Sequence, residues 1–177
     1  MVVHLFSSNS CLLVFLIAVA IVDVATRRIP NLLTVSAAVA GLILNFSQAG
    51  SYGALMGSAG LLTGLAAFMP FYLAKGFGAG DVKAMAAVGA FLGPQGALLA
   101  AAWTLAAGAV GAVLLLIVRG EHTALRALAG RWLWRGYSMY CAGRPVPLVA
   151  RLDDPTRRRF PYGVAIAFGT VLSLAWS

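Results

Sequence analysis

Charged residues are scarce in this sequence of 177 residues: they make up 10% of it, whereas hydrophobic residues make up 61%. Water-soluble domains carry about 25% charged residues, so a soluble globule of this composition would lack the charge to cover its surface. The abundance of apolar residues also excludes a disordered chain. The remaining class is an all-α polytopic membrane protein, and we expect a single membrane-embedded domain over residues 1–177.

Cysteine and histidine are also scarce, and this excludes two further classes of protein. The two cysteines, Cys11 and Cys141, are too few for a disulfide framework and lack the paired spacing of metal-binding motifs. His4 and His122 have no third ligand type near them in the sequence. The sequence therefore predicts no metal site, and we expect both cysteines to be ordinary free thiols.

Six apolar segments are bounded by charged or turn residues. They lie at about 5–25, 32–46, 52–74, 82–93, 96–118 and 161–176. A membrane span needs about 20 residues, so the second, fourth and sixth segments are short for spans. No Lys or Arg precedes the first apolar run, whereas Arg27 and Arg28 follow it. This order favours a retained transmembrane helix over a cleaved signal peptide.

The charge distribution decides between six spans and five. A single helix over 82–118 would be roughly 55 Å long, well beyond a hydrocarbon core of about 30 Å, and Gly93 and Pro94 favour a break. With six spans, all 13 Lys and Arg residues lie on one side of the membrane. The positive-inside rule then predicts that both termini are outside and that the basic loops, including about 119–160, are cytoplasmic.

The net charge of +8 therefore reflects orientation, and nucleic acid is not an expected partner. Within the loop at about 119–160, the segment Leu125–Tyr140 carries Leu and Trp among its arginines, a pattern typical of a basic helix that lies on the anionic inner leaflet. Docking of a substrate or partner is the alternative interpretation.

Acidic residues number only five, and two of them stand apart. The three in the predicted cytoplasmic loop, where solvated charge explains them, are Glu121, Asp153 and Asp154. Asp23 and Asp81 instead adjoin apolar helices at one membrane face, where an ionisable residue indicates function. Two neighbouring carboxylates can share a proton and divide acid and base roles, as in aspartyl peptidases. Alternatively, Asp23 pairs with Arg27 and Asp81 caps a helix, and both interpretations stay open from these residues alone.

The residues around Asp81 add to the candidate site. Gly78 and Gly80 permit backbone conformations with positive φ and the close approach of an extended peptide substrate. Lys83 has two open interpretations: it biases the ionisation of the aspartates or holds the substrate backbone, or it is an interfacial anchor. We include Gly78, Gly80 and Lys83 as residues that shape the site or bind substrate.

Three ordered motifs resemble those of the prepilin peptidases, the G-x-G-D membrane aspartyl proteases of type IV pilus and related secretion systems. The motifs are Asp23 followed by Arg27-Arg28-Ile29-Pro30-Asn31, then Gly78-Ala79-Gly80-Asp81-Val82-Lys83, then Pro161-Tyr162-Gly163-Val164-Ala165. The resemblance implies that Asp23 and Asp81 are the catalytic pair. It also implies cleavage of the leader peptide of a prepilin or pseudopilin at the cytoplasmic face of the bacterial inner membrane.

The resemblance has informative gaps. Longer members of this family carry an N-terminal cytoplasmic region with paired Cys-x-x-Cys motifs and also N-methylate the new pilin terminus. This sequence has no such motif, so we expect a peptidase without methyltransferase activity and without a cofactor, similar to the peptidases of tight-adherence (Flp) pili. Two other functions stay open: a small transporter or channel subunit with the aspartates as ion ligands, and a non-catalytic scaffold for pilus assembly. The sequence does not define an oligomeric state.

Overall fold

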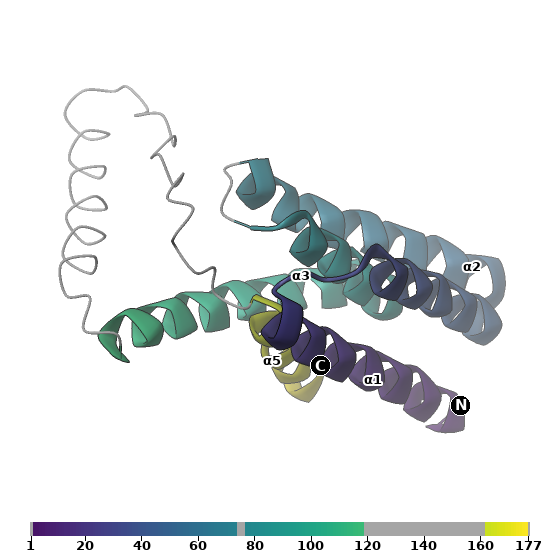
Figure 1. Cartoon of the computed structure of the whole chain (residues 1–177). Coiled ribbons are helices and arrows are strands. Elements are labelled where there is room, and N and C mark those ends of the chain that lie inside the picture. The colour runs from purple at the N-terminus through teal and green to yellow at the C-terminus, as the bar shows by residue number, and fades with distance from the viewer. Residues whose placement is uncertain (1, 74–76, 119–161, 177) are drawn as a thin grey trace. The chain divides into compact units, whose positions relative to one another are not determined.

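The computed structural model describes residues 2–73, 77–118 and 162–176. All regular structure within these ranges is α-helical, which confirms the predicted fold class (Figure 1). The helices are α1 (Val2–Thr26), α2 (Asn31–Leu73), α3 (Ala79–Val118) and α5 (Tyr162–Trp176). The predicted basic loop at about 119–160 lies outside the described residues. Ala109–Val118, the end of α3, belongs to a second compact unit (Ala109–Arg158), so the description below concerns the first unit.

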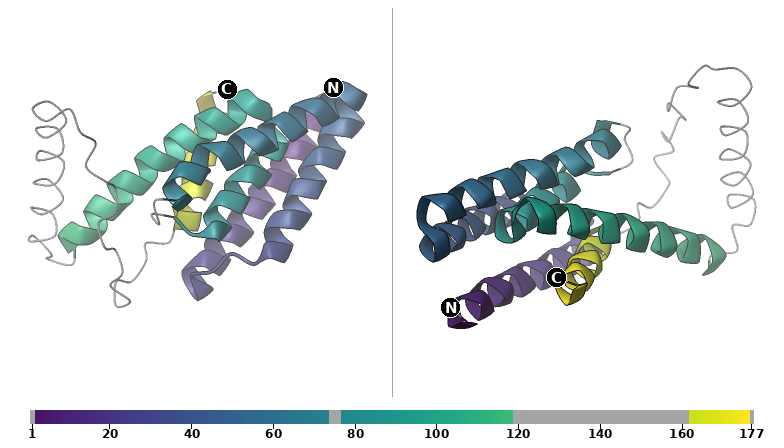
Figure 2. Two further views of the ribbon diagram at one scale, coloured as in Figure 1. Left: turned by 90° about the horizontal axis from the view of Figure 1, so that it is seen from above. Right: turned by 180° about the vertical axis from the view of Figure 1, so that it is seen from behind.

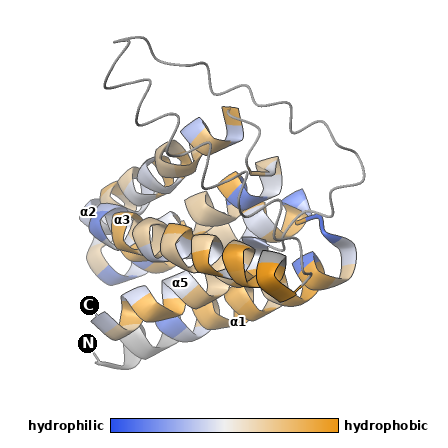
Figure 3. Ribbon diagram, turned by 90° about the vertical axis from the view of Figure 1, so that its left-hand side faces the viewer, coloured by the Kyte–Doolittle hydropathy of each residue, from blue (hydrophilic) through white to orange (hydrophobic). Residues whose placement is uncertain are grey.

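Three of these helices are long and apolar enough to cross a membrane. The qualifying segments are Asn9–Thr26, Asn31–Leu73 and Ala79–Leu115, whereas α5 is an apolar helix of 15 residues. Large aliphatic side chains such as Val14, Leu32 and Leu55 point outward along them, and the helices are predominantly hydrophobic (Figure 3). Continuous exposed apolar surface of this kind marks contact with lipid or a partner, so the protein is membrane-embedded.

The backbone of α2 turns at Ala49 and Gly50. Gly50 has φ 60° and ψ −139°, a conformation that strongly favours glycine. The first arm of α2 (residues 31–48) and its second arm (51–73) then lie side by side (Figure 2). A Cβ atom built on Gly57 would lie 3.2 Å from the Leu42 side chain and 3.5 Å from that of Asn45. The turn falls within the loop predicted between the second and third apolar segments.

A second break divides α3 at Gly93, where φ is 72° and ψ is −177°. This confirms the predicted interruption at Gly93-Pro94 and excludes one continuous helix over 82–118. Pro94 has no backbone N–H, so the carbonyl of Ala90, four residues earlier, loses its usual helical partner. The side chain of Asn45 replaces that partner, because its Nδ2 donates to the Ala90 carbonyl at 2.8 Å and to the Phe91 carbonyl at 3.2 Å.

Glycines allow α2 and the first arm of α3 (residues 79–92) to pack with their backbones in contact. On α2, Gly60 faces Gly89, and Gly64 faces Met85, so closely that a Cβ atom on either α2 glycine would overlap the backbone of α3. Membrane helices use small residues in this way because close backbone approach increases van der Waals packing. The packing holds the start of α3, which carries Asp81, against α2.

Helix α5 packs between α1 and the second arm of α3 (residues 94–108 within the first unit). It runs antiparallel to that arm: Gly169 lies against the backbone of Thr104, and Tyr162 lies against Gly108. It also packs along α1. Figures 1 and 2 show α5 beside the end of α1 in each view, so the first turn of α5 lies next to the last turn of α1.

We expect the substitution Asn45→Ala to lower the free energy of unfolding by about 1–2 kcal/mol, because it leaves the Ala90 carbonyl unsatisfied inside an apolar bundle. Unfolding of the purified protein in detergent by denaturant measures this loss. Ser47→Ala is the matched control, because the Ser47 hydroxyl bonds only locally, to the Leu44 carbonyl at the exposed helix surface. Equal stability of the two variants would contradict the role of Asn45.

Candidate active site

Asp23 lies in the last turn of α1 and is 6% exposed. Its Oδ2 atom accepts a hydrogen bond of 2.6 Å from the backbone N–H of Gly163, at the start of α5. The helix ends just beyond it, at Arg27, which has φ 54° and donates its backbone N–H to the Asp23 carbonyl at 2.8 Å. This is the αL type of helix termination, here with arginine where glycine is usual. The termination fixes Asp23 at the end of the helix.

Asp81 is the third residue of α3 and is 9% exposed. Its Oδ2 accepts the backbone N–H of Gly78 at 2.9 Å, and the Gly78 carbonyl accepts the N–H groups of Asp81 and Val82 at 3.2 and 3.4 Å. A side chain at the third helical position that reaches back to the N-cap N–H is one half of a capping box. The helix-capping contact considered from the sequence is therefore present, but here the carboxylate is buried rather than solvated.

The segments that follow Asp23 and precede Asp81 contact each other. Gly80 packs on Ile29, since a Cβ atom at Gly80 would lie 3.0 Å from the Ile29 Cβ. The Nζ atom of Lys83 donates to Oδ1 of Asn31 at 2.8 Å. The first and second motifs of the sequence, which include Asp23 and Asp81, are therefore in contact with each other.

An aromatic contact joins the residues that hold the two carboxylates. The rings of Phe77 and Tyr162 meet edge to face, with centroids 4.5 Å apart. Phe77 directly precedes Gly78, which binds Asp81, and Tyr162 directly precedes Gly163, which binds Asp23. Phe77 also stacks on Phe68 of α2 at 5.1 Å. A continuous series of contacts therefore links the two aspartates.

The model of the type IV leader peptidase family matches residues 10–116. The chain belongs to this family. The match covers the first two motifs, with Asp23 and Asp81, and confirms the resemblance to this family, while the third motif and α5 lie beyond the matched residues. No curated protein and no solved structure matches the chain.

Two of the three site-shaping residues predicted for this peptidase-family member act through close contact. Neither Gly78 nor Gly80 uses the positive φ that glycine permits. Gly80 is instead needed for the approach of Ile29. A Cβ atom at Gly78 would lie 3.3 Å from Oδ2 of Asp81, so Gly78 keeps the space beside that carboxylate open.

Lys83 is exposed and bonds to Asn31, which favours a role in joining α2 to α3. Phe77 is a residue of the site that the sequence motifs did not indicate. Tyr162 and Gly163 belong to the third motif, but no local pattern in the sequence identifies Asp23, 140 positions away, as the partner of Gly163.

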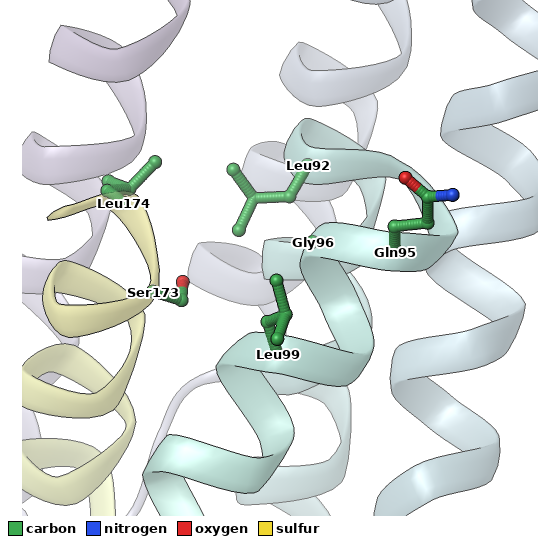
Figure 4. Close-up of a pocket in the computed structure, with 6 residues that line it drawn as sticks. All are labelled: Leu92, Gln95, Gly96, Leu99, Ser173 and Leu174. Carbon is green, nitrogen blue, oxygen red and sulfur yellow. The ribbon is translucent and has the colours of Figure 1, made fainter. Parts of the chain in front are cut away.

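Two of the pockets formed by the described residues contain no carboxylate. One, of about 460 Å³, is lined by aliphatic side chains of α1 and α5 beside Asp23, namely Ala20, Ile21, Val24, Ala25 and Val164. The other, of about 240 Å³, lies near the opposite end of α5, where Leu92, Gln95, Gly96 and Leu99 of α3 face Ser173 and Leu174 (Figure 4). These two pockets therefore supply no carboxylate for acid–base chemistry.

We expect Asn31 and Lys83 to be energetically coupled. In a double-mutant cycle of Asn31→Ala and Lys83→Ala, the coupling free energy should be about 0.5–1.5 kcal/mol, the range for one hydrogen bond. Unfolding of the four proteins in detergent measures it. Strictly additive effects would mean that the side-chain bond does not join α2 to α3 in solution.

Proposed function

We propose that this family member is a membrane aspartyl endopeptidase that removes the leader peptide of type IV prepilins, with Asp23 and Asp81 as its catalytic residues. One observation carries the proposal: the only two acidic residues in the described ranges are both buried, and the segments that hold them contact each other. Burial of a carboxylate is costly, so two such groups joined by one contact network favour a functional pair over two independent structural charges.

The proposed reaction is peptide-bond hydrolysis with water as the nucleophile. In aspartyl peptidases two carboxylates share one proton and divide the acid and base roles, and we assign the same division of roles to Asp23 and Asp81. The ionised carboxylate takes a proton from water, while the protonated one donates to the carbonyl oxygen of the scissile bond. The carboxyl group that took the proton from water then donates it to the amide nitrogen, while a hydroxyl of the tetrahedral intermediate returns a proton to the other carboxylate. The C–N bond breaks, leaving a carboxyl group on the leader and a free amine on the pilin. The acid and base roles belong to the pair rather than to either residue.

Backbone amides hold both carboxylates ready for this chemistry. The N–H of Gly163 binds Asp23 and the N–H of Gly78 binds Asp81, and hydrogen bonds to a carboxylate are among the stronger ones in proteins. The lack of a side chain at Gly78, whose Cβ position is 3.3 Å from Oδ2 of Asp81, supports the close approach of an extended peptide next to Asp81. Gly78 and Gly80 are therefore assigned to shaping the substrate site, and Lys83 to supporting it through Asn31.

The proposed topology has six spans, both termini outside and the aspartates at the cytoplasmic side of the bacterial inner membrane. The breaks at Gly50 and Gly93 support it, because they divide α2 and α3 into arms of the kind that six spans require. The basic residues Arg27, Arg28 and Lys83 flank the aspartates, which favours the cytoplasmic side.

The proposed substrate is a prepilin or pseudopilin, of the Flp class, whose apolar helix stays in the bilayer while its leader reaches the aspartates. We assign cleavage without N-methylation and without a cofactor, because Cys11 and Cys141 do not form the paired motif of methylating relatives. A transporter subunit is disfavoured, because coupling-ion sites usually lie near the bilayer midplane, whereas Asp23 and Asp81 lie at helix ends.

The isosteric substitutions Asp23→Asn and Asp81→Asn should each lower the rate of prepilin cleavage by more than about 10³-fold, as loss of one member of a catalytic unit does. Purified variants in liposomes with a prepilin substrate, analysed by mass spectrometry of the pilin, measure this rate. Asp154→Asn is the matched control and should cleave like the parent protein. Cleavage by both variants while they remain membrane-inserted would contradict the catalytic pair and leave the scaffold or transporter functions.

The topology predicts which single cysteines react from outside the cell. In a protein with Cys11→Ala and Cys141→Ala, the variants Ser51→Cys and Gln95→Cys should react with a membrane-impermeant maleimide added to spheroplasts. The variant Arg28→Cys should react only after the membrane is permeabilised. The reverse pattern would place the aspartates on the outer face.

A further inference from the structure

We infer that the first turn of α5, Tyr162 and Gly163, is a positioning element of the catalytic pair: it holds Asp23 directly and Asp81 through Phe77. The inference rests on the proposed function and extends it to a helix beyond the residues matched by the family model, 10–116. Gly163 has no side chain, and the ring of Tyr162 packs on Phe77, so we assign both residues to positioning the aspartates.

Gly163 acts through its backbone. Its N–H donates to Oδ2 of Asp23 at 2.6 Å, and it is one of the first N–H groups of α5, which have no partner within the helix. A side chain cannot be added there, because a Cβ atom would lie 2.7 Å from the Asp23 Cβ and 2.8 Å from its Oδ2. The position therefore requires glycine for the amide to reach the carboxylate.

Tyr162 acts through its ring. The edge-to-face contact with Phe77, at 4.5 Å, connects the start of α5 to the residue before Gly78, whose N–H holds Asp81. Phe77 is fixed on its other side by Phe68 and Phe71 of α2. A shift of the Tyr162 ring is thus transmitted to the turn that orients Asp81.

The second arm of α3 sets the position of this first turn. Gly108 lies against the Tyr162 ring, where a Cβ atom would be 3.3 Å from the ring, and Gly169 lies against the backbone of Thr104. Only the first of these contacts is next to the aspartates. Gly169 therefore supplies a glycine on the same helix that packs tightly without touching the catalytic pair.

The test is steady-state cleavage of a purified prepilin in liposomes by Gly163→Ala, with kcat and KM determined separately. Displacement of one carboxylate by a fraction of an ångström to 1 Å should lower kcat by on the order of 10²-fold, while KM changes little. Gly169→Ala is the matched control, because it adds the same methyl group to α5. It should lower stability in detergent and keep kcat per folded molecule near that of the parent protein.

A second series of variants, at Tyr162, separates the effect of the aromatic contact from the effect of general packing. Tyr162→Leu removes the aromatic contact and should lower kcat by about 10-fold, whereas Tyr162→Phe keeps the ring and should restore most of the rate. This series keeps the inference testable if Gly163→Ala does not fold.

Parent-like kcat in Gly163→Ala and Tyr162→Leu, with cleavage abolished in Asp23→Asn, would overturn the positioning role and leave the proposed function intact. A loss of kcat in Gly169→Ala equal to that in Gly163→Ala would also overturn it, because the effect would then be general packing. Retained cleavage in Asp23→Asn and Asp81→Asn would instead overturn the proposed function itself.

Discussion

The hydrogen bond between Asp23 and the Gly163 amide is the contact on which the rest of the site depends. It joins the end of α1 to the start of α5, 140 positions later in the chain. A buried carboxylate requires hydrogen-bond donors, and the first N–H groups of a helix require acceptors, so each group satisfies the hydrogen bonding of the other. Everything else around the aspartates, from the Ile29–Gly80 contact to the Phe77–Tyr162 ring pair, is packed about this junction.

Asp81 satisfies the same requirement within its own turn, since Gly78 supplies its amide from three residues away. The two carboxylates therefore differ in what determines their geometry. The orientation of Asp81 is local and forms with the first turn of α3, whereas that of Asp23 exists only once α5 has packed against α1. The assembly of the pair is thus coupled to the docking of the last described helix.

This difference also explains how far the sequence could predict the structure. The break at Gly93-Pro94, the turn near Gly50 and the capping role of Asp81 were predictable, because glycine, proline and aspartate act there on neighbouring residues. The partners of Asp23 and Lys83 were not, because they are set by helices that meet only in the folded protein. The six-span topology and the catalytic role of the aspartates stay predictions.

The location of the proposed pair at helix ends follows from the physical chemistry of a membrane site. In the apolar interior, a carboxylate would need a charged partner, because helical backbone amides there are already paired. At a helix start the amides are unpaired and the helix dipole favours negative charge, so glycine N–H groups suffice to hold each aspartate. Hydrolysis also requires water, which reaches helix ends at the membrane face more readily than the bilayer centre. A peptidase built from apolar helices with two buried acids therefore has its most favourable site where Asp23 and Asp81 lie, next to the basic residues that face the cytoplasm in the proposed topology.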